Sequence, residues 1–308
     1  MNISEEIARR DFLKFTLAAS AAVGIGSNPA ETNAADPDQF SFRRLRAIDV
    51  NVSLSRWPFR QLPEDETEAL VNRLKSNGVV QAWAGSFDGL LSKNLAAVNE
   101  RLATECRERG RGVLVPFGSV NPMLPDWQED LRRCAEVHKM PGIRLHPNYH
   151  DYKLDEPRFA KLLQEAASRG LIVQIAASME DERVQHFLVR VPNVELSPLT
   201  PLIGKNPGLR VVLLNWFRAA KGELLTQLGR TGQVWFDIAM VEGVGGVGQL
   251  LERVTASQVV FGSHAPFYYF ESAALKLQES VLSKQQLAGI SSQNARNLLK
   301  PLMHTNKH

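Results

Sequence analysis

Cysteine is the rarest residue in the chain, with only Cys106 and Cys134 among 308 residues. Two cysteines do not form a disulfide framework. Neither lies in a Cys-x-x-Cys pattern, so the sequence supports neither thiol catalysis nor a zinc knuckle. Both fall on predicted helices with apolar residues at helical spacing, and we expect buried free thiols. A single bridge between them is the alternative in an oxidising compartment.

Long hydrophobic runs and a strong charge excess are also missing. No apolar stretch reaches the roughly 18 residues that a membrane-spanning helix needs, so we expect no transmembrane segment. The 36 basic and 33 acidic side chains leave a formal charge of +3. The basic residues are spread along the chain, whereas nucleic-acid binding calls for a clustered basic face. We therefore expect a small-molecule substrate and no nucleic-acid partner.

The first 35 residues have the composition of an export signal. Arg9 and Arg10 precede Phe-Leu-Lys, a mildly apolar stretch follows at 15–26, and small residues lead to Asp36. This order is typical of a secretory signal, and the arginine pair resembles the twin-arginine type. We expect cleavage near Ala34 or Ala35 and a periplasmic or other extracytoplasmic location. The alternative is an amphipathic N-terminal helix.

From residue 45 to residue 303 the sequence alternates between strand and helix patterns. Apolar strand-like runs lie at 45–52, 79–86, 112–120, 142–147, 171–177, 209–216, 233–240 and 257–263. Helical patterns lie between them and after them, at 65–78, 92–110, 125–139, 155–170, 180–190, 221–230, 247–254, 270–281 and 292–300. Such alternation is typical of an α/β fold with a parallel sheet covered by helices. Eight repeats over about 255 residues predict one (β/α)8 TIM barrel domain, with a doubly wound open sheet as the alternative.

In such a barrel the chemistry lies at the C-terminal ends of the strands. Polar residues stand there in this sequence, and His264 ends the eighth predicted strand. The main candidates in chain order are Asp49, Asn51, Ser53, Arg144, His146, Asn215, Asp237 and His264.

Four stretches resemble the amidohydrolase superfamily, in particular its amidohydrolase-related branch of decarboxylases and lactone hydrolases. They are AIDVNVSLSRWPFR at 47–60, the segment 142–175 beginning GIRLHPNYH, FGSHAPF at 261–267 and NARNLL at 294–299. The resemblance covers roughly residues 45–300. It implies a barrel enzyme that binds one divalent metal, often zinc, which activates a water or polarises the substrate.

The metal ligands implied by the resemblance are mostly missing from this sequence. The family's His-x-His pair on strand 1 falls on Asn51 and Ser53, and its later histidines fall on Ala176 and Asn215. Its strand 8 aspartate falls on His264. Because a catalytic zinc usually has three protein ligands, a bound metal would need a rebuilt set such as His264, His146 and Asp49.

The candidate catalytic residues are His264, Arg144 and His146. We expect His264 to act as an acid or base, or alternatively to hold a neighbouring strand end in place. Arg144 would anchor a substrate anion, or alternatively pair with Asp49 or Asp237. His146 would support His264, or alternatively tie its own loop through Asn148 or Tyr149.

The candidate substrate-binding residues are Asn51, Ser53, Asn215 and Trp57. The two amides would hold a substrate oxygen, or alternatively satisfy buried backbone groups. Trp57 would line a pocket, or alternatively pack in the core.

A glycine-rich segment, GVGGVG at 243–248, fits the G-x-G-x-x-G pattern of dinucleotide-binding sites. It lies in the seventh repeat, and no acidic residue stands about 20 positions later at a strand end. We therefore expect an ordinary loop. Anion binding by its backbone amides is the alternative, because barrels often bind phosphate after strands 7 and 8.

Together these features predict an exported hydrolase or lyase that acts on a small organic acid, ester or lactone and has a depleted metal site. The chain could form a homo-oligomer. The alternative is a catalytically inactive barrel that binds a small molecule or a protein.

Overall fold

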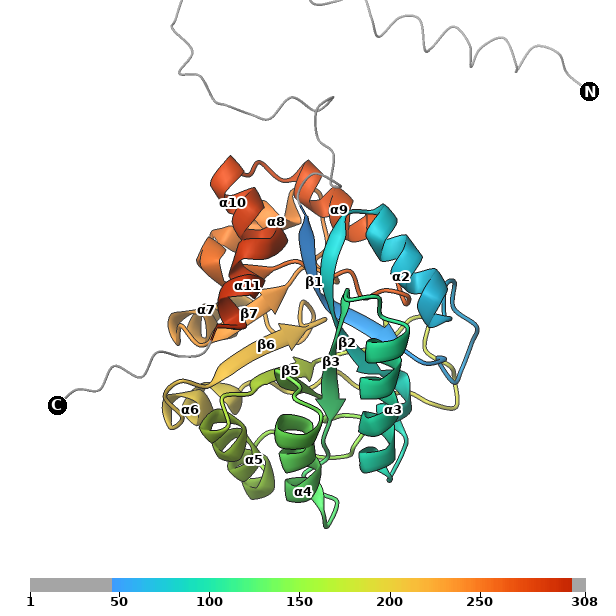
Figure 1. Cartoon of the computed structure of the whole chain (residues 1–308). Coiled ribbons are helices and arrows are strands. Elements are labelled where there is room, and N and C mark those ends of the chain that lie inside the picture. Colours follow the sequence, from blue (N-terminus) through green and yellow to red (C-terminus); the bar gives the residue numbers. More distant parts are fainter. Residues whose placement is uncertain (1–45, 301–308) are drawn as a thin grey trace, which may run out of the picture. The chain divides into compact units, whose positions relative to one another are not determined.

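The computed structural model describes residues 46–300 and shows a ring of eight strands surrounded by helices (Figure 1). The predicted export signal at 1–35 lies outside the described residues. The strands are β1 (Ala47–Leu54), β2 (Val79–Ser86), β3 (Leu114–Ser119), β4 (Gly142–Leu145), β5 (Ile172–Ala176), β6 (Arg210–Leu214), β7 (Val234–Asp237) and β8 (Val259–Val260).

Each strand pairs in parallel with the next, in the order β1 to β8. The ring closes where Val50 N donates to the carbonyl of Phe261 at 2.9 Å and Ser53 N donates to the carbonyl of Ala265 at 2.9 Å. The fold is therefore a (β/α)8 barrel, as the alternation predicted.

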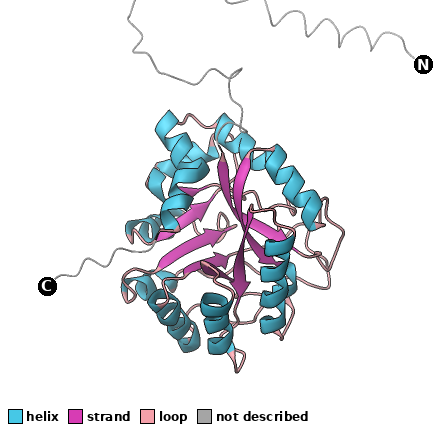
Figure 2. Cartoon of the chain, viewed as in Figure 1, coloured by secondary structure: helices cyan, strands magenta, loops and turns pink. Residues whose placement is uncertain are grey.

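The helices form the outer layer (Figure 2). They are α2 (Thr67–Ser76), α3 (Leu95–Glu108), α4 (Trp127–Arg132), α5 (Pro157–Ser168), α6 (Leu199–Gly204), α7 (Gly222–Arg230), α8 (Gly246–Leu251), α9 (Phe270–Glu279), α10 (Lys284–Ala288) and α11 (Asn294–Leu298). Short 3-10 segments lie at η4 (Phe87–Leu90) and η6 (Ala256–Gln258), and π-helical turns lie at η5 (Arg133–Val137) and η7 (Gly289–Gln293).

The helix predicted over 180–190 is wrong. Turns occupy this segment, and α6 begins only at Leu199. Val184, Phe187 and Leu188 have helical spacing but remain 59%, 73% and 73% exposed. A short amphipathic helix depends on packing for its stability, and these side chains have no core to pack against.

The barrel interior is layered along its axis. Side chains inside the ring form an apolar layer that includes Ile48, Trp83 and Val260. Polar side chains from the strand ends form the next layer. Loops carry an aromatic cluster over these ends, with Trp57 and Phe267 among its members. A second, larger apolar core lies between strands and helices.

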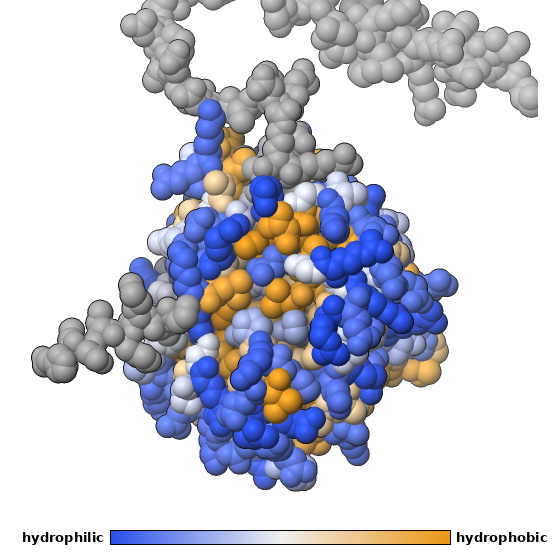
Figure 3. Space-filling view, viewed as in Figure 1, coloured by the Kyte–Doolittle hydropathy of each residue, from blue (hydrophilic) through white to orange (hydrophobic). Residues whose placement is uncertain are grey.

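The two cysteines and the glycine-rich segment have the structure that the sequence predicted for them. Cys106 and Cys134 are buried and free, which confirms the first prediction made for them. The segment 243–248 is a turn that leads into α8, with Gly243 and Gly245 at φ 89° and 68°. On the face seen in Figure 3, hydrophobic residues gather near the centre and hydrophilic residues lie around them.

Candidate active site

A hydrogen-bonded cluster joins the ends of β1, β6 and β7 inside the barrel. Asn51 Nδ2 donates to Asn215 Oδ1 at 2.9 Å and to Asp237 Oδ2 at 2.7 Å. Asn215 N donates to Asp237 Oδ1 at 3.0 Å, and Asn215 Nδ2 donates to the carbonyl of Ser178 at 2.8 Å. The cluster brings together three of the candidate residues, Asn51, Asn215 and Asp237, and the two amides bond one another and the buried carboxyl group.

His264 lies beside this cluster and is buried. Its Nε2 lies 2.9 Å from the carbonyl oxygen of Met179, so the bond requires the proton on Nε2. Asn215 Nδ2 lies 3.4–3.5 Å from both ring nitrogens, and the ring stacks on Phe267 with centroids 5.0 Å apart. Burial lowers the pKa of His264 to about 4, so its imidazole is neutral near pH 7.

Two buried carboxyl groups complete the polar layer. Asp49 Oδ1 accepts from the backbone N–H groups of Asn51 and Ser263, each at 3.0 Å, while its Oδ2 is buried without a partner. Burial raises the pKa of Asp49 to about 6 and that of Asp237 to about 7. Both groups can therefore exchange a proton close to neutral pH.

Arg144 is fully engaged by the protein. Its Nε donates to Gln174 Oε1 at 2.8 Å, and its Nη atoms donate to Ser53 Oγ at 3.2 Å and to three backbone carbonyl groups. Those carbonyls belong to Val50, Val52 and Trp83, so all five N–H donors of the guanidinium have a partner. Burial lowers its pKa to about 10, while the charges of Asp49 and Asp237 act to raise it. No donor is left for the substrate anion expected from the sequence.

His146 lies in the same layer, also buried. Its Nδ1 has no hydrogen-bond partner, and its ring centroid is 6.0 Å from that of His150. Burial lowers its pKa well below the usual value. The link to the following loop runs through its backbone carbonyl, which accepts from Tyr149 N at 3.1 Å. The imidazole therefore stays available for another partner.

The metal site implied by the family does not fit these donors. Within residues 46–300 no group of three His, Cys, Asp or Glu side chains is arranged to hold a metal ion, and this includes the set His264, His146 and Asp49. Asp49 Oδ1 already accepts two backbone N–H groups, and His264 Nε2 is bound to the carbonyl of Met179.

An aromatic cluster covers the polar layer. Trp57 packs edge-on against Phe87 and Phe267, with ring centroids 5.2 Å and 5.0 Å apart. Trp57 is buried, and its Nε1 has no partner. The tryptophan thus packs at the mouth, between the polar layer and the solvent.

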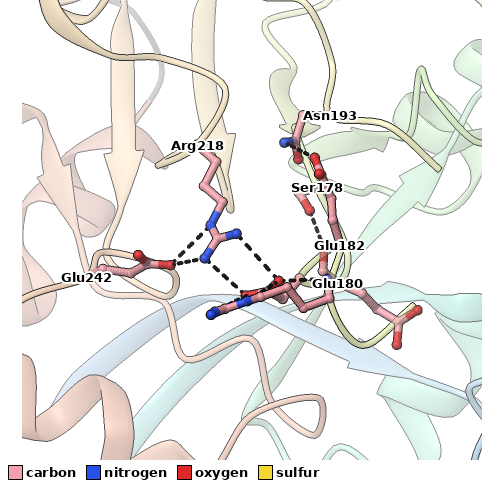
Figure 4. A network of polar contacts seen from close by, with 8 residues as sticks. Ser178, Glu180, Glu182, Asn193, Arg218 and Glu242 are labelled. Carbon is pink, nitrogen blue, oxygen red and sulfur yellow. Dashed lines mark hydrogen bonds and ion pairs between the residues drawn. The ribbon is translucent and has the colours of Figure 1, made fainter. Parts of the chain in front are cut away.

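An ion-pair network ties together three loops at this mouth (Figure 4). Arg218, which follows β6, contacts Asp181 at 3.1 Å and Glu242 at 2.8 Å. These acids follow β5 and β7. Ser178 Oγ donates to the carbonyl of Glu180 at 2.9 Å within the β5 loop. The network holds the loops around the aromatic cluster.

Several residues that build the site were absent from the sequence-based set. Gln174 Oε1 accepts a hydrogen bond from Arg144 Nε at 2.8 Å. Lys276 of α9 donates to the carbonyl of Ala239 near Asp237. A Cβ at Gly85 would lie 2.8 Å from Arg144, and one at Gly262 would lie 2.8 Å from Asp237 Oδ2. The sequence did carry a signal for Gly85 and Gly262. A glycine in or next to a strand often marks a place where another group approaches the backbone closely.

No helix in the described part of the chain is long and apolar enough to cross a membrane.

Comparison with solved structures supports the barrel fold. 2,6-Dihydroxybenzoate decarboxylase from Rhizobium gives a TM-score of 0.63 at 14% identity, covering 82% of this chain and 97% of that chain. 5-Carboxyvanillate decarboxylase from Sphingomonas paucimobilis gives 0.63 at 12% identity, covering 83% and 99%. A dihydroxybenzoic acid decarboxylase from Polaromonas sp. JS666, solved with bound manganese and 2-nitroresorcinol, gives 0.64 at 13% identity, covering 82% and 96%.

A search of curated proteins finds no significant match to the sequence. A family model described as amidohydrolase matches residues 91–300, which is more than half of the chain. The chain therefore belongs to the amidohydrolase family.

Proposed function

We propose that this protein is an exported hydrolase or lyase that acts on a small organic acid, ester or lactone without the family's divalent metal. The observation that carries the proposal is the pair of buried carboxyl groups, Asp49 and Asp237, whose pKa values burial raises to about 6 and about 7. They share the polar layer with a neutral imidazole, that of His264. Acid/base catalysis is most effective when such groups titrate near the working pH.

Each group has a defined task in this proposal. His264 keeps its proton on Nε2, bound to the carbonyl of Met179. For an ester or lactone, its Nδ1 accepts a proton from the water that attacks the carbonyl carbon, and protonated Asp237 donates its proton to the alkoxide oxygen as the C–O bond breaks. For an acid that loses CO2, protonated Asp237 donates its proton to the carbanion left when the C–C bond breaks. Arg144 stays in place and supplies a fixed positive charge that favours the ionised form of Asp49.

The substrate class follows from the surroundings of these groups. Aromatic rings cover the polar layer, so the site suits a small and partly apolar molecule. The three similar structures named above are decarboxylases of aromatic acids by their titles, which agrees with a small organic acid. Entry requires the covering loops to move, as lids do in many enzymes.

The test is a panel of aryl esters, lactones and hydroxybenzoates assayed with the purified protein in the presence of a chelator. We expect turnover that survives chelation and falls at least about 100-fold in His264→Asn, as loss of an acid/base group typically does. Asparagine is chosen because residue 264 has φ 59°, which asparagine tolerates. Circular dichroism checks that the variant is folded. Activity that is lost on chelation and restored by zinc or manganese would contradict the proposal.

The second candidate is a binding module without catalysis. The observation that favours it is burial: His264, Asn51, Asn215 and Asp237 are each 0–2% exposed. In that case the whole panel gives no turnover, and a ligand that binds the wild type binds His264→Asn with similar affinity.

Export and assembly are separate parts of the proposal. Replacing Arg9 and Arg10 by lysine should keep the protein in the cytoplasm, because the arginine pair is the proposed export signal. Fractionation checks the location, and Lys14→Arg serves as the control outside the pair. Periplasmic protein in the double variant would contradict the twin-arginine route. Light scattering of the purified protein tests for a homo-oligomer.

A further inference from the structure

A groove of about 1180 Å³ runs along the outside of the barrel between α5 and α6. None of its lining residues belongs to the candidate active site. Helix α6 is short, with only six residues. Helix α5 has twelve, so the short α6 leaves much of its flank open. The two helices are neighbours in the outer layer (Figure 1).

The charges that line this groove are all positive. Lys161 comes from α5, Arg169 follows α5, Lys205 follows α6 and Arg210 begins β6, while no lining residue is acidic. Arg169 contacts Glu165 at 3.3 Å, which offsets part of its charge. Lys161 and Lys205 are exposed and form no ion pair within residues 46–300. A concave surface with one sign of charge concentrates ligands of the opposite sign.

Arg210 is a buried charge at this groove, and it has no acidic partner within residues 46–300. The residue is only 7% exposed. Its Nη1 donates to the carbonyl groups of Leu298 at 2.5 Å and Lys300 at 2.9 Å, and its Nη2 donates to that of Gly170. Its Nε is buried and has no partner. Buried charges in proteins are normally paired, so an arginine with only neutral carbonyl partners and an unpartnered Nε points to an anionic ligand.

We propose that this groove binds a phosphate-bearing organic molecule. Phosphate oxygens match the donors of Arg210 and the two lysines, since charge-assisted bonds to phosphate are strong and arginine suits their geometry. The remaining wall is largely apolar and includes Ala160 and Leu202. It suits the organic part of the ligand. The groove is large enough for more than one phosphate group.

The experiment uses the purified protein with inorganic pyrophosphate as the probe in calorimetric titration. Lys161→Ala with Lys205→Ala removes two exposed charges from the groove and leaves Arg210 in place, where it bonds the carbonyls of Leu298 and Lys300. Lys75→Ala with Lys284→Ala is the matched control, because both are exposed lysines on other helices, α2 and α10. We expect pyrophosphate to bind the wild type and the control alike, and to bind the groove variant at least tenfold more weakly.

A second experiment distinguishes a lipid headgroup from a soluble organic phosphate as the ligand. Vesicles of phosphatidylglycerol and of phosphatidylcholine are mixed with the three proteins and separated by flotation. Flotation with the anionic vesicles that depends on Lys161 and Lys205 identifies a lipid headgroup. Pyrophosphate binding without flotation identifies a soluble organic phosphate. Absence of both, or an equal loss in the control variant, overturns the proposal.

Discussion

Replacing Arg144 by methionine tests whether this arginine supports the barrel or serves the substrate. Its guanidinium bonds Gln174, Ser53 and the backbone carbonyl groups of β1 and β2 from inside the ring. Methionine is similar in length, and its flexible apolar side chain can fill the vacated space. The variant therefore removes the donors and the charge without leaving a large cavity.

The expected loss of stability follows from the acceptors that lose their Arg144 donor. Five hydrogen bonds disappear, and only the carbonyl of Val50 keeps a side-chain partner, Gln174 Nε2 at 2.7 Å. Removing one partner of a buried charged interaction of this kind lowers the free energy of unfolding by about 3–5 kcal/mol. For a chain of this size that loss corresponds to a melting temperature about 10 °C lower.

Urea unfolding monitored by tryptophan fluorescence measures this loss. Arg253→Met, a change at an exposed arginine, should lower stability by less than about 0.5 kcal/mol. Our reasoning would be refuted if Arg144→Met unfolded with a free energy within about 1 kcal/mol of the wild type. A normal stability combined with a raised KM for an acidic substrate would instead restore the role of Arg144 as an anion anchor.

Further predictions concern the same layer and the buried thiols. Gly262→Ala should destabilise the protein by about 1–3 kcal/mol in urea unfolding, because the added Cβ would lie 2.8 Å from Asp237 Oδ2. The pKa of His264 is lowered to about 4 in the folded state, so the unfolded chain takes up the extra proton first as pH falls. Stability should therefore decline as pH drops from about 6.5 to about 4, and this decline should be smaller in His264→Asn. Burial raises the pKa of Cys106 and Cys134 to about 12, so both should resist a thiol reagent such as DTNB until the protein is unfolded; fast labelling at neutral pH would contradict this. A chelator should leave the melting temperature unchanged, and a drop would reveal a structural metal.

The repeat pattern made the fold predictable from the sequence. Apolar strand runs separated by helical patterns occur eight times, and few arrangements other than a barrel bury eight such strands in one domain. The segment 180–190 shows where this reasoning fails. Its apolar spacing is helical, but spacing does not reveal whether a partner surface exists. Phe159, Leu162 and Ala166 of α5 have the same helical spacing, and their side chains are buried in the core.

The location of the candidate site was predictable from the sequence, but the hydrogen-bond partners of its residues were less so. The strand-end rule places Asn51, Asn215 and His264 in one layer, and the structure brings them within hydrogen-bond distance or close to it. The partners of Arg144 were not predictable, because they are backbone carbonyls and Gln174, a residue inside β5. Backbone partners leave no mark in a sequence pattern. The catalytic and binding roles stay predictions.

The missing helix before α6 also has a consequence for hydrogen exchange. Amide protons exchange through local openings, which occur most readily where few side chains cover the backbone. Strands β5 and β6 have five residues each and lie behind α5 and the short α6, whereas β1 and β2 have eight each. Deuterium should therefore enter β5 and β6 before it enters β1 and β2. The sector of the barrel beside the groove would then be less protected than the sector formed by β1 and β2, and a ligand bound there would slow exchange in β5 and β6.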